Sequence, residues 1–197
     1  MAILLLDLTG VLYDYSHRAR IEALSSASGR TAEQVEEVVF GSGFFRRCIR
    51  GRIDEAQMAQ YLDAELGLRG AALDAAWAGG WTPRPAALEL LGRVRPDVDR
   101  ALVTNNDPLM TRLLREAAPI GALVPRMLCS GDLGASKPDP AAFAAALRLL
   151  GVRAATARFV DDTAANVDAA RTLGIEAAHT PDLAALTDAL TGWELLG

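Results

Sequence analysis

The chain has 197 residues, of which 51% are hydrophobic and 23% charged, so it is long enough to bury a full core. Its 20 basic and 25 acidic residues give a net charge of −5, which argues against a nucleic-acid partner. No apolar run reaches the length of a membrane span, and no basic leader precedes residues 3–6, so we expect neither a membrane anchor nor a signal peptide. Cys48 and Cys129 lack metal-type spacing, and free thiols in a reducing compartment predict a cytoplasmic protein.

A short apolar run opens the chain, from Ile3 to Leu6, and ends at Asp7 before the turn residues Thr9 and Gly10. The run is too short for a helix and is typical of a central parallel strand that is buried on both faces. Ligands of open α/β sheets bind at the carboxyl ends of the strands, so Asp7 lies where chemistry is expected. A lone aspartate at a strand end is more often a turn former or helix cap, so Asp7 by itself does not establish a catalytic site.

The next segment, from Ser16 to about Gly79, has helical periodicity and no convincing strand. Ser16, Thr31 and a capping box at Asp54 mark helix starts, and a Gly/Pro-rich stretch follows the last helix. We therefore expect an all-helical cap, residues 15–81, inserted into a core made of residues 1–14 and 82–197. Such an insert is expected to form a lid over the sheet edge.

From Pro85 onward the pattern alternates between helices and apolar strands, with strands expected near residues 100–104, 123–129, 158–161 and 175–178. Alternation of this kind predicts an α/β fold with a doubly wound parallel sheet and right-handed crossovers. Polar side chains follow several of these strands: Thr104, Lys137, Asp161 and Asp162.

If these strands are neighbours, their polar ends meet Asp7 at one edge of the sheet. Carboxylates held together repel one another and raise each other's pKa unless a cation lies between them. A carboxylate-rich site without His or Cys ligands favours Mg²⁺ shared with a phosphate. We expect Mg²⁺ to bridge Asp7, Asp162 and a phosphate group.

The remaining side chains fit the needs of phosphoryl transfer. Asp7 is the expected nucleophile, attacking phosphorus to give an aspartyl-phosphate. Lys137 supplies a compact positive charge, and the Thr104 hydroxyl and Asn105 amide supply hydrogen-bond donors to the phosphate oxygens.

Together these segments resemble the haloacid dehalogenase superfamily, through the strings DLTGV at residues 7–11, LVTNN at 102–106, SKPDPAAF at 136–143 and FVDDTAANVDAA at 159–170. The resemblance implies a Rossmann-like, three-layer α/β/α core, a mobile helical cap and Mg²⁺ dependence. It also implies functional roles for the matched residues Asp7, Thr104, Lys137, Asp161 and Asp162, with Asp7, Asp161, Asp162 and the Thr9 carbonyl as the metal ligands.

One position departs from the pattern. Phosphatases of this superfamily usually carry a second aspartate two residues after the nucleophile, where this chain has Thr9. A threonine hydroxyl does not titrate near neutral pH, so it cannot replace a general acid and base, whose contribution is about 10²–10⁴-fold in rate. We expect a slow phosphoric-ester hydrolase, unless another residue such as His17 supplies the proton.

Two alternatives stay open at this point. Members that break carbon–halogen bonds also lack the second aspartate, which keeps a 2-haloacid dehalogenase as an alternative. They need no metal, however, and the pair Asp161 and Asp162 beside Lys137 favours the metal-dependent phosphatase. A relative that binds phosphate without turnover is the non-enzymatic alternative.

The expected substrate is a small phosphorylated metabolite, and neither its identity nor the oligomeric state is readable from the sequence. Arg46 and Arg47, with Arg50 and Arg52, form a basic cluster that is expected either to meet an anionic substrate or to form a solvated face.

Overall fold

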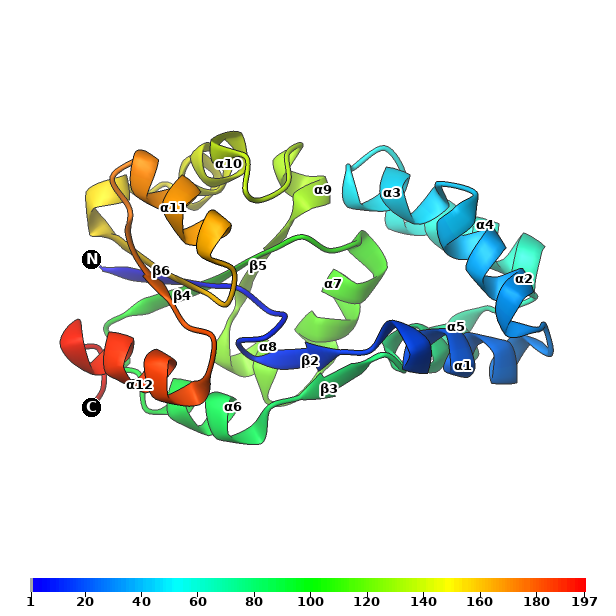
Figure 1. Ribbon diagram of the computed structural model, residues 1–197, viewed down its shortest axis with the longest axis horizontal. Helices are drawn as coiled ribbons and strands as arrows, with labels where there is room; N and C mark the ends of the chain where they lie inside the picture. Colours follow the sequence, from blue (N-terminus) through cyan, green and yellow to red (C-terminus); the bar gives the residue numbers. More distant parts are fainter. Residues whose placement is uncertain (1) are drawn as a thin grey trace.

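A single parallel sheet forms the centre of the computed structural model, which describes residues 2–197 (Figure 1). The sheet has five strands in the order β5-β4-β1-β6-β7, and every neighbouring pair is parallel. Their bounds are Ile3–Leu6 (β1), Asp99–Thr104 (β4), Arg126–Cys129 (β5), Ala157–Asp161 (β6) and Glu176–His179 (β7). The opening apolar run is therefore the middle strand, as its composition predicted.

Helices cover both faces of this sheet. Because alternate strand residues point to opposite faces, Leu4 and Leu6 join one apolar core while Ile3 and Leu5 join the other. The first core includes side chains of α6 (Pro85–Gly92), α7 (Pro108–Glu116) and α12 (Leu183–Gly192). The second includes α10 (Pro140–Leu150) and α11 (Ala164–Thr172). The predicted three-layer, doubly wound arrangement is confirmed.

The shorter core helices lie in the connections between these elements. They are α8 (Ile120–Leu123), α9 (Ser130–Leu133) and the 3₁₀ turn η2 (Ala154–Thr156). Cys48 and Cys129 are buried and not joined to each other. Within residues 2–197, no helix combines the length and apolar character that a bilayer span requires.

The remaining helices form what we call the helical segment, which lies beyond the carboxyl edge of the sheet (Figure 1). It contains α1 (His17–Ser28), α2 (Ala32–Glu36), the π-helix η1 (Glu37–Gly41), α3 (Phe44–Ile49), α4 (Glu55–Leu66) and α5 (Gly70–Ala78). The predicted helix starts are confirmed, since Ser16, Thr31 and Asp54 each accept a hydrogen bond from a first-turn backbone N–H.

A two-stranded antiparallel ribbon connects the helical segment to the sheet, and the sequence analysis did not predict it. Its strands are β2 (Tyr13–Tyr15) and β3 (Trp81–Pro83). The rings of Tyr15 and Trp81 pack with their centroids 4.9 Å apart. The ends of the range expected to be all-helical, Tyr15 and Trp81, are therefore strand residues that pair with each other.

Candidate active site

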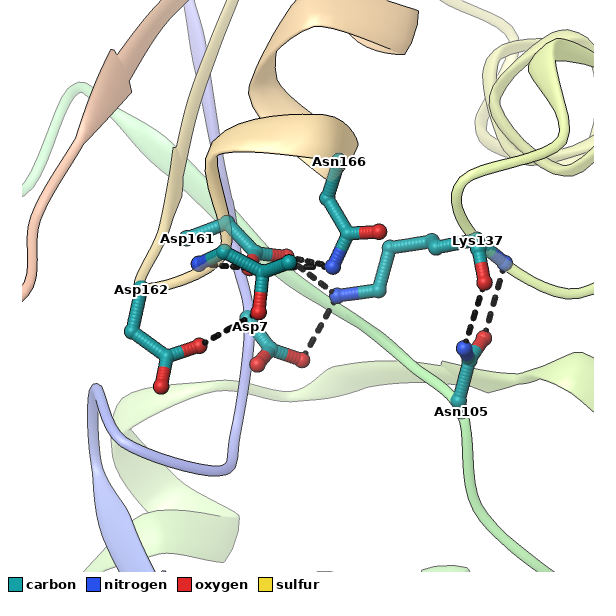
Figure 2. A network of polar contacts seen from close by, with 7 residues as sticks. Asp7, Asn105, Lys137, Asp161, Asp162 and Asn166 are labelled. Carbon is teal, nitrogen blue, oxygen red and sulfur yellow. Dashed lines mark hydrogen bonds and ion pairs between the residues drawn. The ribbon is translucent and has the colours of Figure 1, made fainter.

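The carboxylates at the ends of β1 and β6 converge at the carboxyl edge of the sheet (Figure 2). Asp7 follows β1, Asp161 ends β6 and Asp162 is the next residue. One oxygen from each of these three side chains can be chosen so that all lie within 4.8 Å of one another. The predicted convergence of acidic groups from distant parts of the chain is thus present in the structure.

Lys137 lies between two of these carboxylates. Its Nζ is 2.6 Å from Oδ1 of Asp7 and 2.6 Å from Oδ2 of Asp161, and all three side chains are less than 10% exposed. Lys137 is also the only lysine among the 20 basic residues of the chain. A compact ammonium contacts two converging carboxylates through one atom, whereas a guanidinium is a wider planar fork.

The Asp7 carboxyl is buried beside a second carboxylate, and both conditions disfavour its ionised form. Its pKa is raised from 3.8 to about 6, chiefly by burial; the Lys137 charge opposes this rise, and the nearby Asp161 carboxylate adds to it. One lysine therefore does not fully compensate the buried negative charge. A divalent cation is the group that would favour the ionised carboxylate.

Asp161 and Asp162 have different surroundings. The Asp161 carboxylate accepts hydrogen bonds from the Thr163 backbone N–H at 2.8 Å and the Asn166 amide at 3.0 Å, in addition to Lys137. Asp162 is partly exposed and accepts only the Thr163 hydroxyl, at 3.2 Å, among the described residues. Asp161 is therefore suited to orient Lys137, and Asp162 keeps oxygen available for a ligand.

The loop after β4 contributes the predicted polar pair. Thr104 is buried at the end of the strand. The Asn105 side chain donates to the Lys137 carbonyl at 2.7 Å and accepts from the Lys137 backbone N–H at 2.8 Å. This double hydrogen bond fixes the backbone of Lys137 at the carboxyl edge of the sheet. Contact of the Asn105 amide with a phosphate stays a prediction, because both ends of the amide are used by Lys137 in this arrangement.

A family model for "haloacid dehalogenase-like hydrolase" matches residues 1–174. The chain belongs to this family of hydrolases. A curated relative, "Phosphatase MT3486" from Mycobacterium tuberculosis, is 38% identical over 103 residues, which are 52% of this chain and 46% of the relative. The chain thus matches about half the length of that phosphatase.

Solved structures of haloacid dehalogenase-family proteins share the fold. The family enzyme bt-2542 from Bacteroides thetaiotaomicron, in complex with magnesium and inorganic phosphate, superposes with a TM-score of 0.69 at 25% identity, covering 90% of this chain and 92% of that one. L-2-haloacid dehalogenase from Xanthobacter autotrophicus, with chloropropionic acid covalently bound, gives a TM-score of 0.59 at 22% identity, covering 100% and 85%. The Rossmann-like core inferred from the sequence motifs is therefore confirmed.

In this family member, Thr9 is exposed on the turn that follows Asp7. The Arg84 guanidinium holds this turn by donating to the Gly10 carbonyl, and its Nε lies 3.8 Å from the Asp14 carboxylate. Sequence reasoning gave Arg84 no role. The sequence feature that could have indicated a role for Arg84 is its position next to Pro85, where the chain returns to the core.

The predicted substrate contacts Arg46 and Arg47 belong to the helical segment, and their contact with a substrate stays a prediction. Arg46 and Arg47 are exposed on α3, and neither forms an ion pair with any residue of the described range 2–197. His17 Nε2 lies 2.7 Å from the Glu36 carboxylate, at a half-exposed position of the helical segment. The structure therefore places His17 with Glu36, and its role as a proton donor stays a prediction.

Proposed function

We propose that this protein is a Mg²⁺-dependent phosphoric-ester hydrolase that acts on a small phosphorylated metabolite through an aspartyl-phosphate at Asp7. The observation that carries the proposal is the contact of one buried lysine with both Asp7 and Asp161, beside the partly exposed carboxylate of Asp162. The partial relative is named a phosphatase, and a neighbour of the same fold binds magnesium and phosphate.

The donor set fits magnesium, because it consists of oxygen ligands with uncompensated negative charge. Asp7, Asp162 and the Thr9 carbonyl would hold the ion, with Asp161 supporting the set through Lys137. When bound, the ion neutralises charge and orients the phosphate group toward Asp7.

In the reaction, an Asp7 oxygen forms a bond to phosphorus while the bond from phosphorus to the leaving oxygen breaks. Lys137 holds the Asp7 carboxylate in place and balances charge on the phosphate oxygens. Water then cleaves the aspartyl-phosphate and releases inorganic phosphate. Because Thr9 cannot protonate the leaving oxygen, esters of acidic alcohols are the favoured substrates.

The helical segment has the position of a lid, and we propose residues 15–81 as a cap on a core of residues 1–14 and 82–197. Movement about the β2–β3 ribbon would admit substrate and then exclude water from Asp7. A cytoplasmic location is part of the same proposal.

An assay with phenyl phosphate and acetyl phosphate tests the function. We expect phosphate release that needs Mg²⁺, stops with a chelator and is lost in Asp7→Asn. No release from either compound at high enzyme concentration would overturn the proposal and favour phosphate binding without turnover.

A dehalogenase is the second candidate, because Thr9 leaves the site without the second carboxylate of a phosphatase. Chloride release from chloropropionate that persists in chelator would establish it. Since Asp7 is the nucleophile in both reactions, the chelator result rather than the Asp7→Asn variant separates them.

A further inference from the structure

Arg20 on α1 is completely buried at 0% exposure. Its Nε and both terminal nitrogens have no hydrogen-bond partner among the described residues 2–197. Leaving a buried charged donor unsatisfied is costly, so such a group is uncommon without a ligand or a functional reason.

Aromatic rings surround this guanidinium. The Arg20 Cζ lies 4.6 Å from the ring centroid of Trp77, 5.1 Å from that of Tyr15 and 5.8 Å from that of Trp81. Rings stabilise a cation at its flat faces, whereas the N–H groups of a guanidinium point outward in its own plane. The rings therefore satisfy the charge of Arg20 in part and leave its hydrogen-bonding edges free.

The buried carboxylate nearby has partners of its own. Asp107 accepts from the Trp77 indole N–H at 3.1 and 3.2 Å and from the Met110 backbone N–H at 2.8 Å, as the cap of α7. No ion pair joins it to Arg20 in the part of the chain that the structure describes. The two groups still interact through space: the charge of Arg20 opposes the rise that burial causes in the pKa of Asp107, and the charge of Asp107 opposes the fall that burial causes in the pKa of Arg20. The hydrogen-bonding nitrogens of Arg20 nevertheless stay without an acceptor among the described residues.

Besides the Ser25 hydroxyl on α1, two buried donors in the neighbouring segments are without a partner among the described residues. They are Nε1 of Trp81 and Nδ2 of Asn106. A polyol ligand both donates and accepts hydrogen bonds, so its binding site would need acceptors as well as donors. A ligand that only accepts hydrogen bonds fits a site with an excess of donors. A carboxylate is such a group, and its planar oxygens match the guanidinium fork.

Arg20 and its neighbours belong to segments that adjoin the carboxyl edge of the main sheet. Asn106 and Asp107 follow Thr104 directly along the chain, while Arg20 and the rings belong to the helical segment and the ribbon. Arg20 therefore lies where the helical segment meets the loop after β4. The part of a substrate that extends from the phosphate toward the helical segment would approach this place when the segment opens.

We propose that Arg20 determines substrate specificity by binding a carboxylate on the leaving group of the phosphate ester. This inference rests on the proposed phosphatase function and adds a substrate class to it: phosphate monoesters of acidic alcohols that carry a carboxylate. Arg20 is a binding residue here and takes no part in bond cleavage.

The test compares matched substrates. Phenyl phosphate, meta- and para-carboxyphenyl phosphate and the corresponding uncharged carboxamides are assayed with the full-length protein and Mg²⁺. We expect kcat/KM for at least one carboxylate to exceed that of its carboxamide by about tenfold to hundredfold, mainly through KM. Equal values for carboxylate and carboxamide in both isomers would overturn the inference.

Variants of Arg20 test whether this residue causes the preference for carboxylate substrates. Arg20→Met and Arg20→Lys should remove or reduce the ratio between carboxylate and carboxamide, with the lysine variant retaining more of it. Arg18→Met is the matched control, because Arg18 is an exposed arginine of the same helix. If Arg20 is only structural, its variants will lower activity on all substrates by the same factor, and this result would also overturn the inference.

Binding gives a readout that does not depend on turnover. In Asp7→Asn, para- or meta-carboxyphenyl phosphate should change the fluorescence of Trp77 and Trp81, and the carboxamide should bind more weakly. If Arg20 variants do not fold, this comparison in the Asp7→Asn background still decides the question. Failure of the proposed function looks different, because then no aryl phosphate is hydrolysed by the unmodified protein.

Discussion

Gly10 lies against Asp162 so closely that a Cβ atom on Gly10 would be 2.0 Å from Oδ2 of that carboxylate. Gly10 also has a φ of +77°, a conformation that L side chains rarely adopt. The turn after Asp7 and the residue that follows β6 are therefore fitted to each other. Any side chain at Gly10 must displace the carboxylate expected to bind Mg²⁺.

Gly10→Ala should weaken Mg²⁺ binding, measured by calorimetric titration, by about tenfold or more, since it moves a metal ligand. Gly29→Ala is the control, because Gly29 has a φ of +71° and open space around its Cα. Both variants should lose about 1 kcal/mol of stability from backbone strain. Equal Mg²⁺ affinity in the two variants would contradict the expected role of Asp162.

Thr9→Asp should raise turnover of alkyl phosphates by about 10²–10⁴-fold, because it supplies a group that can protonate the leaving oxygen. The gain should be smaller with aryl phosphates, whose leaving oxygens need less help. Thr9→Asn has similar size without a titrating group and should give no gain. Steady-state kinetics of both variants on both substrate types measure the difference; unchanged alkyl-phosphate turnover in Thr9→Asp would refute the proton-transfer argument.

Lys137→Met should destabilise the metal-free protein by about 3–5 kcal/mol, because Asp7 and Asp161 would face each other in the interior without their shared cation. Urea unfolding gives the free energy. Added Mg²⁺ should recover more stability in this variant than in the unmodified protein. Lys137→Arg tests whether charge alone is enough; full stability in that variant would show that the compact ammonium is not required.

Mg²⁺ binding should weaken as the pH falls below about 6, since the pKa of Asp7 is raised to about 6 and a protonated carboxyl is a poor ligand. Without metal, the folded protein holds this proton more tightly than the unfolded chain does. The resulting stabilisation is complete below the unfolded value of 3.8 and is lost as the pH rises through about 6.

Thermal unfolding with and without Mg²⁺ at pH 5 and 7.5 measures this effect. We expect a larger Mg²⁺-dependent increase in Tm at pH 7.5. Asp7→Asn should raise the metal-free Tm at pH 7.5 and abolish the pH dependence of the metal effect. A Tm increase of the same size at both pH values would count against the raised pKa.

Arg112 of α7 connects the core to the helical segment through Glu55 of α4 and Asp74 of α5. Its side chain is 27% exposed, so Arg112→Met should cost only about 1–2 kcal/mol of stability. The larger effect should be faster hydrogen exchange in α4 and α5, together with altered KM. Arg18→Met removes an ion pair within one helix and should change neither. Unaltered exchange in Arg112→Met would show that these ion pairs do not hold the segment.

Much of the fold was predictable because its signals are local. The uniform apolar run of β1 and the capping boxes at Thr31 and Asp54 each depend on a few neighbouring residues. The acidic pair at Asp161 and Asp162 was predictable for a related reason, since strand order in a parallel α/β sheet brings strand ends together.

The missed features depend on contacts between distant residues. Strands of three residues, as in the β2–β3 ribbon, are too short to show an alternating pattern. Arg20 was overlooked because an arginine on a helix is normally expected in solvent, and nothing in its own segment indicates the rings that bury it. The hydrogen bonds between Asn105 and Lys137 were not predicted, because the two residues lie 32 positions apart in the chain.

Pairing of Tyr13–Tyr15 with Trp81–Pro83 places the departure and return of the polypeptide side by side. The backbone pairing of the main sheet involves no residue between these two strands. The hydrogen bonds of the main sheet are therefore complete without residues 16–80. On the proposed division into cap and core, these residues could change in length and sequence, and with them the range of substrates, while the strands that position Asp7 and Asp161 stay the same.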